Sequence, residues 1–137
     1  MQVIVPRMPV IPPDKTVVVA QVPHGAFPMA YWLSATVIGH SATGGNFTQG
    51  VVATVLLRVP IVKHLVAWVG AKPADRGVML KLLREGCCVG TAPEGLAGTF
   101  DSCSTHEERV CLSRHKGYIR VALEAGVDIL PVPLILE

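Results

Sequence analysis

The sequence predicts an α/β fold: a mostly parallel sheet flanked by helices. Short apolar runs at residues 16–22, 87–92 and 128–136 have the length and branched side chains of buried strands. Helical patterns precede the second and the third run, at 77–85 and in a stretch that ends at Ala125. Strand–helix–strand units with these spacings are typical of parallel neighbours joined by crossovers.

The composition indicates one apolar domain in a reducing compartment. The 137 residues are half hydrophobic and only 16% charged, with a net charge of +2. Such a balance favours a buried sheet, a lipid-like ligand or contact with a membrane surface. The chain has no basic run and few aromatic residues, so nucleic acid is excluded as a partner. Cys87 and Cys88 are adjacent in a predicted strand, unlike a secreted disulfide framework.

Residues 1–13 are expected to form a proline-punctuated lead-in, and residues 14–137 the folded domain. The lead-in has no continuous apolar core, so no signal peptide is predicted. The most apolar long segment, 51–69, carries Arg58, Pro60 and Lys63 and is too polar to span a bilayer. Contact with a membrane is therefore expected to be peripheral.

The other expected elements follow from turn and cap signals. Pro23 and Gly25 end the first strand, and Gly86 ends the helix at 77–85. The remaining predictions are a helix at 28–38, a loop at 39–50, a strand or helix before Pro60 with a helix after it, a turn at 70–76, a loop at 96–103, and a helix that starts near Thr105, weakens near Gly117 and runs to Ala125. Pro131 and Pro133 predict an irregular or edge position for the last strand.

Four residues in the second half of the chain have side chains that bind metals: Cys103, His106, Cys111 and His115. Their spacing contains no Cys-x-x-Cys pair, and two of them fall in a predicted helix. We therefore predict no zinc site, and no metal is expected.

Two predicted strands end in the same way, in Val22-Pro23-His24-Gly25 and Ala92-Pro93-Glu94-Gly95. In a parallel sheet both turns leave from one edge, where α/β sheets place their ligands, and this brings a base and a carboxylate to one rim. A histidine at this position is also compatible with a turn residue that has no chemistry. Arg76, just before the next helix, is well placed to bind an anion.

The order of these blocks resembles the glycerolipid acyltransferase superfamily, and most closely its type-2 diacylglycerol acyltransferase branch. Pro23-His24-Gly25 is similar to the branch's His-Pro-His-Gly block, residues 70–76 to its Gly…Arg block, and Pro93-Glu94-Gly95 to a more widely shared block. The stretch 114–132 resembles the branch's longest signature. The chain departs from the pattern at Val22, where the branch has its first histidine, and at Pro28, where the superfamily has an aspartate.

The resemblance implies the fold of these acyltransferases, without their N-terminal membrane segment and C-terminal part. It implies transfer of a fatty acyl group from acyl-CoA to the hydroxyl of an acylglycerol in neutral-lipid synthesis. In that reaction His24 is the general base, amides around Gly25 stabilise the oxyanion, and Glu94 orients His24 or the acceptor hydroxyl. The implied substrate-binding residues are Gly25, Arg76, Pro93, Gly95, Arg114 and Lys116.

No cofactor is expected, because acyl-CoA is a co-substrate. The expected partners are acyl-CoA, a lipid acceptor and the surface of the endoplasmic reticulum membrane or of lipid droplets. Two alternatives stay open: acylation of a lysophospholipid or glycerol phosphate, and a catalytically dead module that binds acyl-CoA or lipid. For Arg114 and Lys116 the alternative is a solvated helix face. The sequence does not determine the acceptor, the acyl length or the oligomeric state.

Overall fold

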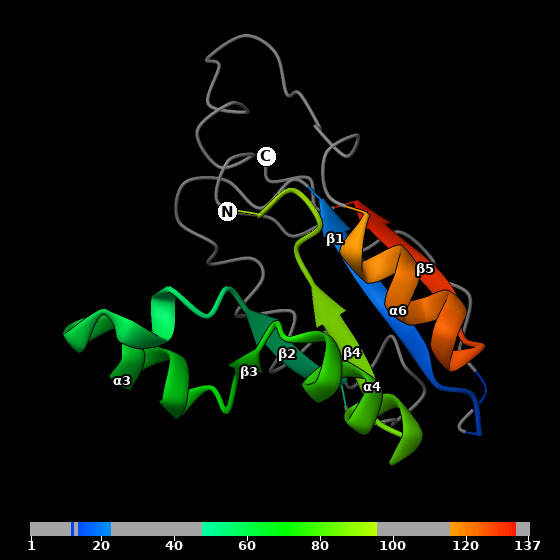
Figure 1. Ribbon diagram of the computed structural model, residues 1–137, viewed down its shortest axis with the longest axis horizontal. Coiled ribbons are helices and arrows are strands. Elements are labelled where there is room, and N and C mark those ends of the chain that lie inside the picture. The colour runs from blue at the N-terminus through cyan, green and yellow to red at the C-terminus, as the bar shows by residue number, and fades with distance from the viewer. Residues whose placement is uncertain (1–11, 13, 23–47, 96–115, 134–137) are drawn as a thin grey trace, which may run out of the picture.

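The computed structural model describes residues 12, 14–22, 48–95 and 116–133. Within these residues five parallel strands form one sheet, in the order β3-β2-β4-β1-β5 (Figure 1). The strands are β1 (Val17–Val22), β2 (Thr48–Val52), β3 (Lys72–Pro73), β4 (Cys88–Thr91) and β5 (Asp128–Pro133). The helices are the 3-10 helix η2 (Leu56–Arg58), α3 (Pro60–Trp68), α4 (Arg76–Arg84) and α6 (Gly117–Ala125). The predicted α/β fold with a parallel sheet is confirmed.

Helices α4 and α6 cover one face of the sheet (Figure 1). Alternate strand residues, Val18 and Val89 among them, pack there against Leu83 of α4 and Val121 of α6. The intervening residues belong to a second buried cluster on the opposite face, made of Val17, Val19, Cys88 and Val132. β1 and β4 are therefore buried on both faces, which explains why they have no polar alternation.

The strand predicted at 16–22, the strand at 87–92 and the helix at 77–85 are confirmed by β1, β4 and α4. The Asp75 carboxylate caps α4 by accepting a hydrogen bond of 2.9 Å from the Gly77 N–H. Gly86 follows the helix with a φ of 82°, a left-handed conformation that glycine adopts without strain. The predicted helix after Pro60 is α3, with Pro60 at its first position.

Two short strands correct the sequence prediction. The loop predicted at 39–50 extends too far, since Thr48–Gly50 belong to β2, and the turn predicted at 70–76 contains β3. β2 contains Gln49 and Gly50, so it shows no apolar run; it is a strand because β4 pairs with it at Thr48↔Cys88 and Gly50↔Gly90. β3 has two residues and pairs with β2 alone. Tertiary pairing overrides local propensity at both places.

The described part of the predicted C-terminal helix is α6, which begins at Gly117 after Lys116 (φ −94°, ψ 6°) and ends at Ala125 as predicted. The part predicted from near Thr105 lies outside the described residues. The edge position predicted for the last strand is confirmed, because among the described strands β5 pairs with β1 alone. Pro131 and Pro133 are tolerated there, since an edge strand has one row of N–H groups without a strand partner. The helix predicted at 28–38 and the loop at 96–103 lie outside the described residues.

Candidate active site

The carboxyl ends of β1 and β4 lie side by side. The two strands are parallel neighbours, with Val18 opposite Val89 and Ala20 opposite Thr91. Val22, the last residue of β1, and the turn after β4 therefore leave the sheet from the same edge. The predicted adjacency of the two strand ends is confirmed. His24 and Gly25, which follow β1, lie outside the described residues.

The turn after β4 holds Glu94 at this edge. The Gly95 N–H donates a hydrogen bond of 3.2 Å to the Ala92 carbonyl oxygen, so Pro93 and Glu94 are the central residues of a β-turn. Proline presets φ at the first central position, and Gly95 closes the turn with a φ of 63°. The Pro-Glu-Gly sequence thus fits this turn.

Glu94 is completely buried, with 0% of its surface exposed. Burial of a carboxyl group is costly unless the group is hydrogen-bonded or paired, so Glu94 is not an ordinary solvated charge. Gln21 and Thr91, at the ends of β1 and β4, are buried polar residues as well. The sequence interpretation overlooked both, although a polar residue at the end of an otherwise apolar strand was a usable signal. The edge therefore combines an apolar sheet with hydrogen-bonding groups, as ligand sites do.

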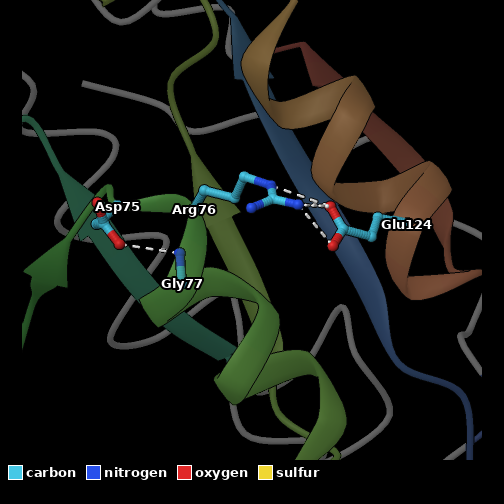
Figure 2. A network of polar contacts seen from close by, with 4 residues as sticks. All are labelled: Asp75, Arg76, Gly77 and Glu124. Atoms are coloured by element: carbon cyan, nitrogen blue, oxygen red, sulfur yellow. Dashed lines mark hydrogen bonds and ion pairs between the residues drawn. The ribbon is translucent and has the colours of Figure 1, made fainter.

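Arg76 forms a two-point ion pair with Glu124 (Figure 2). Its Nε lies 3.0 Å from Glu124 Oε2, and its Nη2 lies 2.8 Å from Oε1 and 2.7 Å from Oε2. Arg76 is the first residue of α4, while Glu124 is in the last turn of α6. The planar guanidinium suits a carboxylate in this fork geometry. The sequence interpretation missed Glu124, because nothing local connects residues 48 positions apart.

This ion pair is open to solvent. The side chains are 68% exposed for Arg76 and 37% exposed for Glu124. Water and salt screen such a pair, so its contribution to stability is at most about 1 kcal/mol. A phosphate group that reached Arg76 would thus compete with a weakly held carboxylate. The segment that leads into α4 is held at the carboxyl end of β2, because the Ala74 N–H donates a hydrogen bond of 2.7 Å to the Val52 carbonyl oxygen.

The other predicted binding residues are only partly described. Pro93 is buried and Gly95 half-buried in the turn described above. Lys116 is exposed and precedes α6, whose N-terminal end lies toward the carboxyl ends of β1 and β5 (Figure 1). Arg114 lies outside the described residues. The exposed position of Lys116 is compatible with a solvated side chain and with a side chain that binds phosphate.

Metal-binding and membrane-spanning features were sought in the described part of the chain. Residues 14–22, 48–95 and 116–133 contain no group of three or more His, Cys, Asp or Glu side chains arranged to hold a metal ion. Cys103, His106, Cys111 and His115 lie outside these ranges. None of the described helices is long and apolar enough to cross a bilayer.

Comparison with known proteins identifies a family. A family model described as diacylglycerol acyltransferase matches residues 5–134, nearly the whole chain. The match includes β1, β4, the Pro93-Glu94-Gly95 turn and both helices that carry the Arg76–Glu124 pair. No solved structure matches the chain.

Proposed function

The chain belongs to the diacylglycerol acyltransferase family, and from this premise we propose that it transfers a fatty acyl group from acyl-CoA to the hydroxyl of an acylglycerol. The observation that carries the proposal is the register of β1 and β4. It places Val22, two residues before His24 in the sequence, at the same edge of the sheet as the Glu94 turn. Two peptide units separate His24 from Val22, which keeps their Cα atoms within about 7 Å of each other.

His24 acts as the general base in this proposal. An imidazole with an ordinary pKa of about 6.5 accepts the proton of the acceptor hydroxyl near neutral pH. The hydroxyl oxygen then attacks the thioester carbonyl carbon, and amides of the turn around Gly25 stabilise the negative charge on the carbonyl oxygen. Collapse of this intermediate forms the ester and breaks the C–S bond. The proton held by His24 goes to the leaving thiolate of CoA.

Glu94 orients the base or the acceptor. Its complete burial supports this role, because a carboxyl group fixed in a dry site holds its partner in one direction. The β-turn hydrogen bond from Gly95 fixes the backbone on which the carboxyl group stands. The sequence has Pro28 in place of the superfamily's aspartate, and Glu94 is a described carboxylate in the turn beside the end of β1, the strand that precedes His24.

Arg76 binds phosphate of CoA, with Lys116 and Arg114 as further cations. The exposure of Arg76 supports this assignment, since its guanidinium is accessible from solvent. Glu124 then has to give way to the phosphate, or to share the guanidinium with it. The reaction takes place at the surface of the endoplasmic reticulum membrane or of a lipid droplet, where acylglycerols reside.

A transfer assay with labelled acyl-CoA and a panel of acceptors tests the function. Diacylglycerol, monoacylglycerol, a lysophospholipid and glycerol phosphate are presented in the same detergent or vesicle background. We expect labelled product with the neutral acylglycerols. Transfer to the phosphorylated acceptors alone assigns Arg76 to the acceptor phosphate and contradicts the proposal. Binding of acyl-CoA without transfer to any acceptor identifies a catalytically dead module.

A further inference from the structure

Helix α3 carries an apolar stripe that faces solvent. Ile61, Leu65 and Trp68 follow one another at helical spacing, so they lie on one side of the helix. Their exposed fractions are 77%, 37% and 85%. Val55 and Val59, in the segment that leads into α3, are exposed as well. Five large apolar side chains of one local segment therefore face water. Such a cluster is typical of an interaction site, whereas isolated exposed apolar residues are ordinary.

The fold holds this stripe away from the core. α3 lies beyond the β3 edge of the sheet, apart from α4 and α6 (Figure 1). Val66 is its one buried side chain. The Nε2 of Gln49 donates a hydrogen bond of 2.5 Å to the carbonyl oxygen of Gly70, which ties the end of the helix to β2. The helix is thus attached along one side and leaves the opposite, apolar side uncovered.

The charged side chains in the segment that carries the stripe are all positive. Arg58, Lys63 and Lys72 are exposed, and residues 48–74 contain no aspartate or glutamate. At 100° per residue His64 lies beside the stripe and Lys63 on the other side of the helix. A helix is about 10 Å wide, close to the Debye length at 0.1 M salt, so salt partly screens Lys63 from a surface that the stripe touches.

We propose that α3 and the preceding segment 55–59 dock this protein on a bilayer that contains anionic lipid, with the stripe of Ile61, Leu65 and Trp68 inserted among the acyl chains. Cations complement the negative surface of such a bilayer, while Trp68 suits the boundary between headgroups and hydrocarbon. A second copy of the chain is disfavoured as occupant, because a symmetric contact brings the same cations together without an acid to neutralise them. This docking element rests on the proposed function, because it would bring the enzyme to the surface where its acylglycerol acceptor resides.

Vesicle binding without substrates tests the docking surface. Flotation is measured with vesicles of phosphatidylcholine alone and with vesicles that also contain phosphatidylserine. We expect the wild-type chain to partition onto the anionic vesicles. The triple variant Ile61→Ser, Leu65→Ser, Trp68→Ser should partition at least tenfold less. Arg58→Gln should lower partition to anionic vesicles about fivefold, and Lys63→Gln should lower it less, because Lys63 lies on the far side of the helix from the stripe.

Matched control variants distinguish binding through the docking surface from non-specific binding to vesicles. Leu123→Ser removes an equally exposed leucine (77%) from α6 and should leave partition unchanged. Lys81→Gln removes an exposed cation from α4 and should matter less than Arg58→Gln. In a Trp32→Phe chain, Trp68 is the one remaining tryptophan, and its emission should shift to the blue and be quenched by brominated lipid.

Two results overturn the proposal. One is a triple variant that floats like the wild type. The other is a wild-type chain that binds neither vesicle type but forms a dimer, while the triple variant stays monomeric. That result assigns the stripe to a contact between two copies of the chain. The assay contains no acyl-CoA and no acceptor, so a chain without transferase activity gives the same binding. Failure of the docking surface and failure of the proposed function are therefore distinguishable.

Discussion

The guanidinium of Arg76 and the carboxylate of Glu124 join the start of α4 to the end of α6 across one face of the sheet. The pair bridges the two helices that cover this face (Figure 2). Leu83 of α4 and Val121 of α6 belong to the buried core on the same face. Because the pair is exposed, it stabilises the contact between the two helices only weakly, and the Arg76 guanidinium is accessible to a ligand. These two roles predict different effects of mutation.

Removing the carboxylate should free the cation. Glu124→Gln is expected to lower the free energy of unfolding by less than about 1 kcal/mol, because the pair is exposed. If Arg76 binds CoA phosphate, Glu124→Gln tightens CoA binding, and Arg76→Gln weakens it about tenfold through loss of a charge-assisted contact. Calorimetric titration with CoA measures both effects. Lys81→Gln, which removes another exposed cation of α4, is the control. An unchanged Kd in Arg76→Gln assigns Arg76 to the ion pair alone.

Loss of the base should affect the chemical step rather than folding. His24→Ala is expected to reduce transfer about a hundred- to ten-thousand-fold, the usual cost of losing a general base. Glu94→Gln should reduce it less. Since the two residues act as a unit, the double variant should be little slower than His24→Ala alone. Rates are compared under saturating acyl-CoA, and circular dichroism checks the fold of each variant. Full activity of His24→Ala identifies His24 as a turn residue without chemistry.

Two leucines test where the core lies. Leu83 is 4% exposed and packs in the cluster under α4, whereas Leu123 is 77% exposed on α6. Leu83→Ala should destabilise the fold by about 2–5 kcal/mol through lost burial and a cavity. Leu123→Ala should change the free energy of unfolding by no more than about 0.5 kcal/mol. Urea denaturation of both variants gives the two values. Equal effects contradict the described packing of α4 and α6 on the sheet.

Cys88 should make the fold sensitive to alkaline pH. Burial raises the pKa of its thiol above the ordinary value; a hydrogen bond with the Val17 backbone opposes this shift, and the nearby Cys87 adds to it. Its Sγ lies 3.9 Å from the carbonyl oxygen of Lys15, which accepts from the protonated thiol. The folded state thus favours the neutral thiol. Its stabilising effect is complete below pH 9 and is lost as the pH rises through the folded-state pKa.

The measurement is urea denaturation from pH 7 to pH 10.5 under reducing conditions. The wild type should lose stability above pH 9 more steeply than Cys88→Ala, by up to about 1.4 kcal/mol per pH unit. Cys87→Ala, which removes the neighbouring half-buried thiol, should retain most of the steepness. Identical slopes for the wild type and Cys88→Ala exclude a role for this thiol.

The sequence by itself determined the elements whose signals are local. The apolar runs that begin β1 and β4 are strong signals, because strands buried on both faces favour apolar side chains on both sides of the sheet. The stop of α4 at Gly86 is equally local. The turn that carries Glu94 and the resemblance to an acyltransferase family also came from the residues alone.

Only the tertiary structure decided the order of the strands and what it brings together. β4 lies between β1 and β2 in the sheet, although β2 and β3 precede it in the sequence. This insertion places the Glu94 turn beside the end of β1. β2 and β3 are strands because their backbone groups bond to neighbours distant in sequence. The Arg76–Glu124 pair and the exposed stripe of α3 likewise depend on how helices pack, since side-chain contact and solvent exposure are properties of the assembled chain and not of any local pattern.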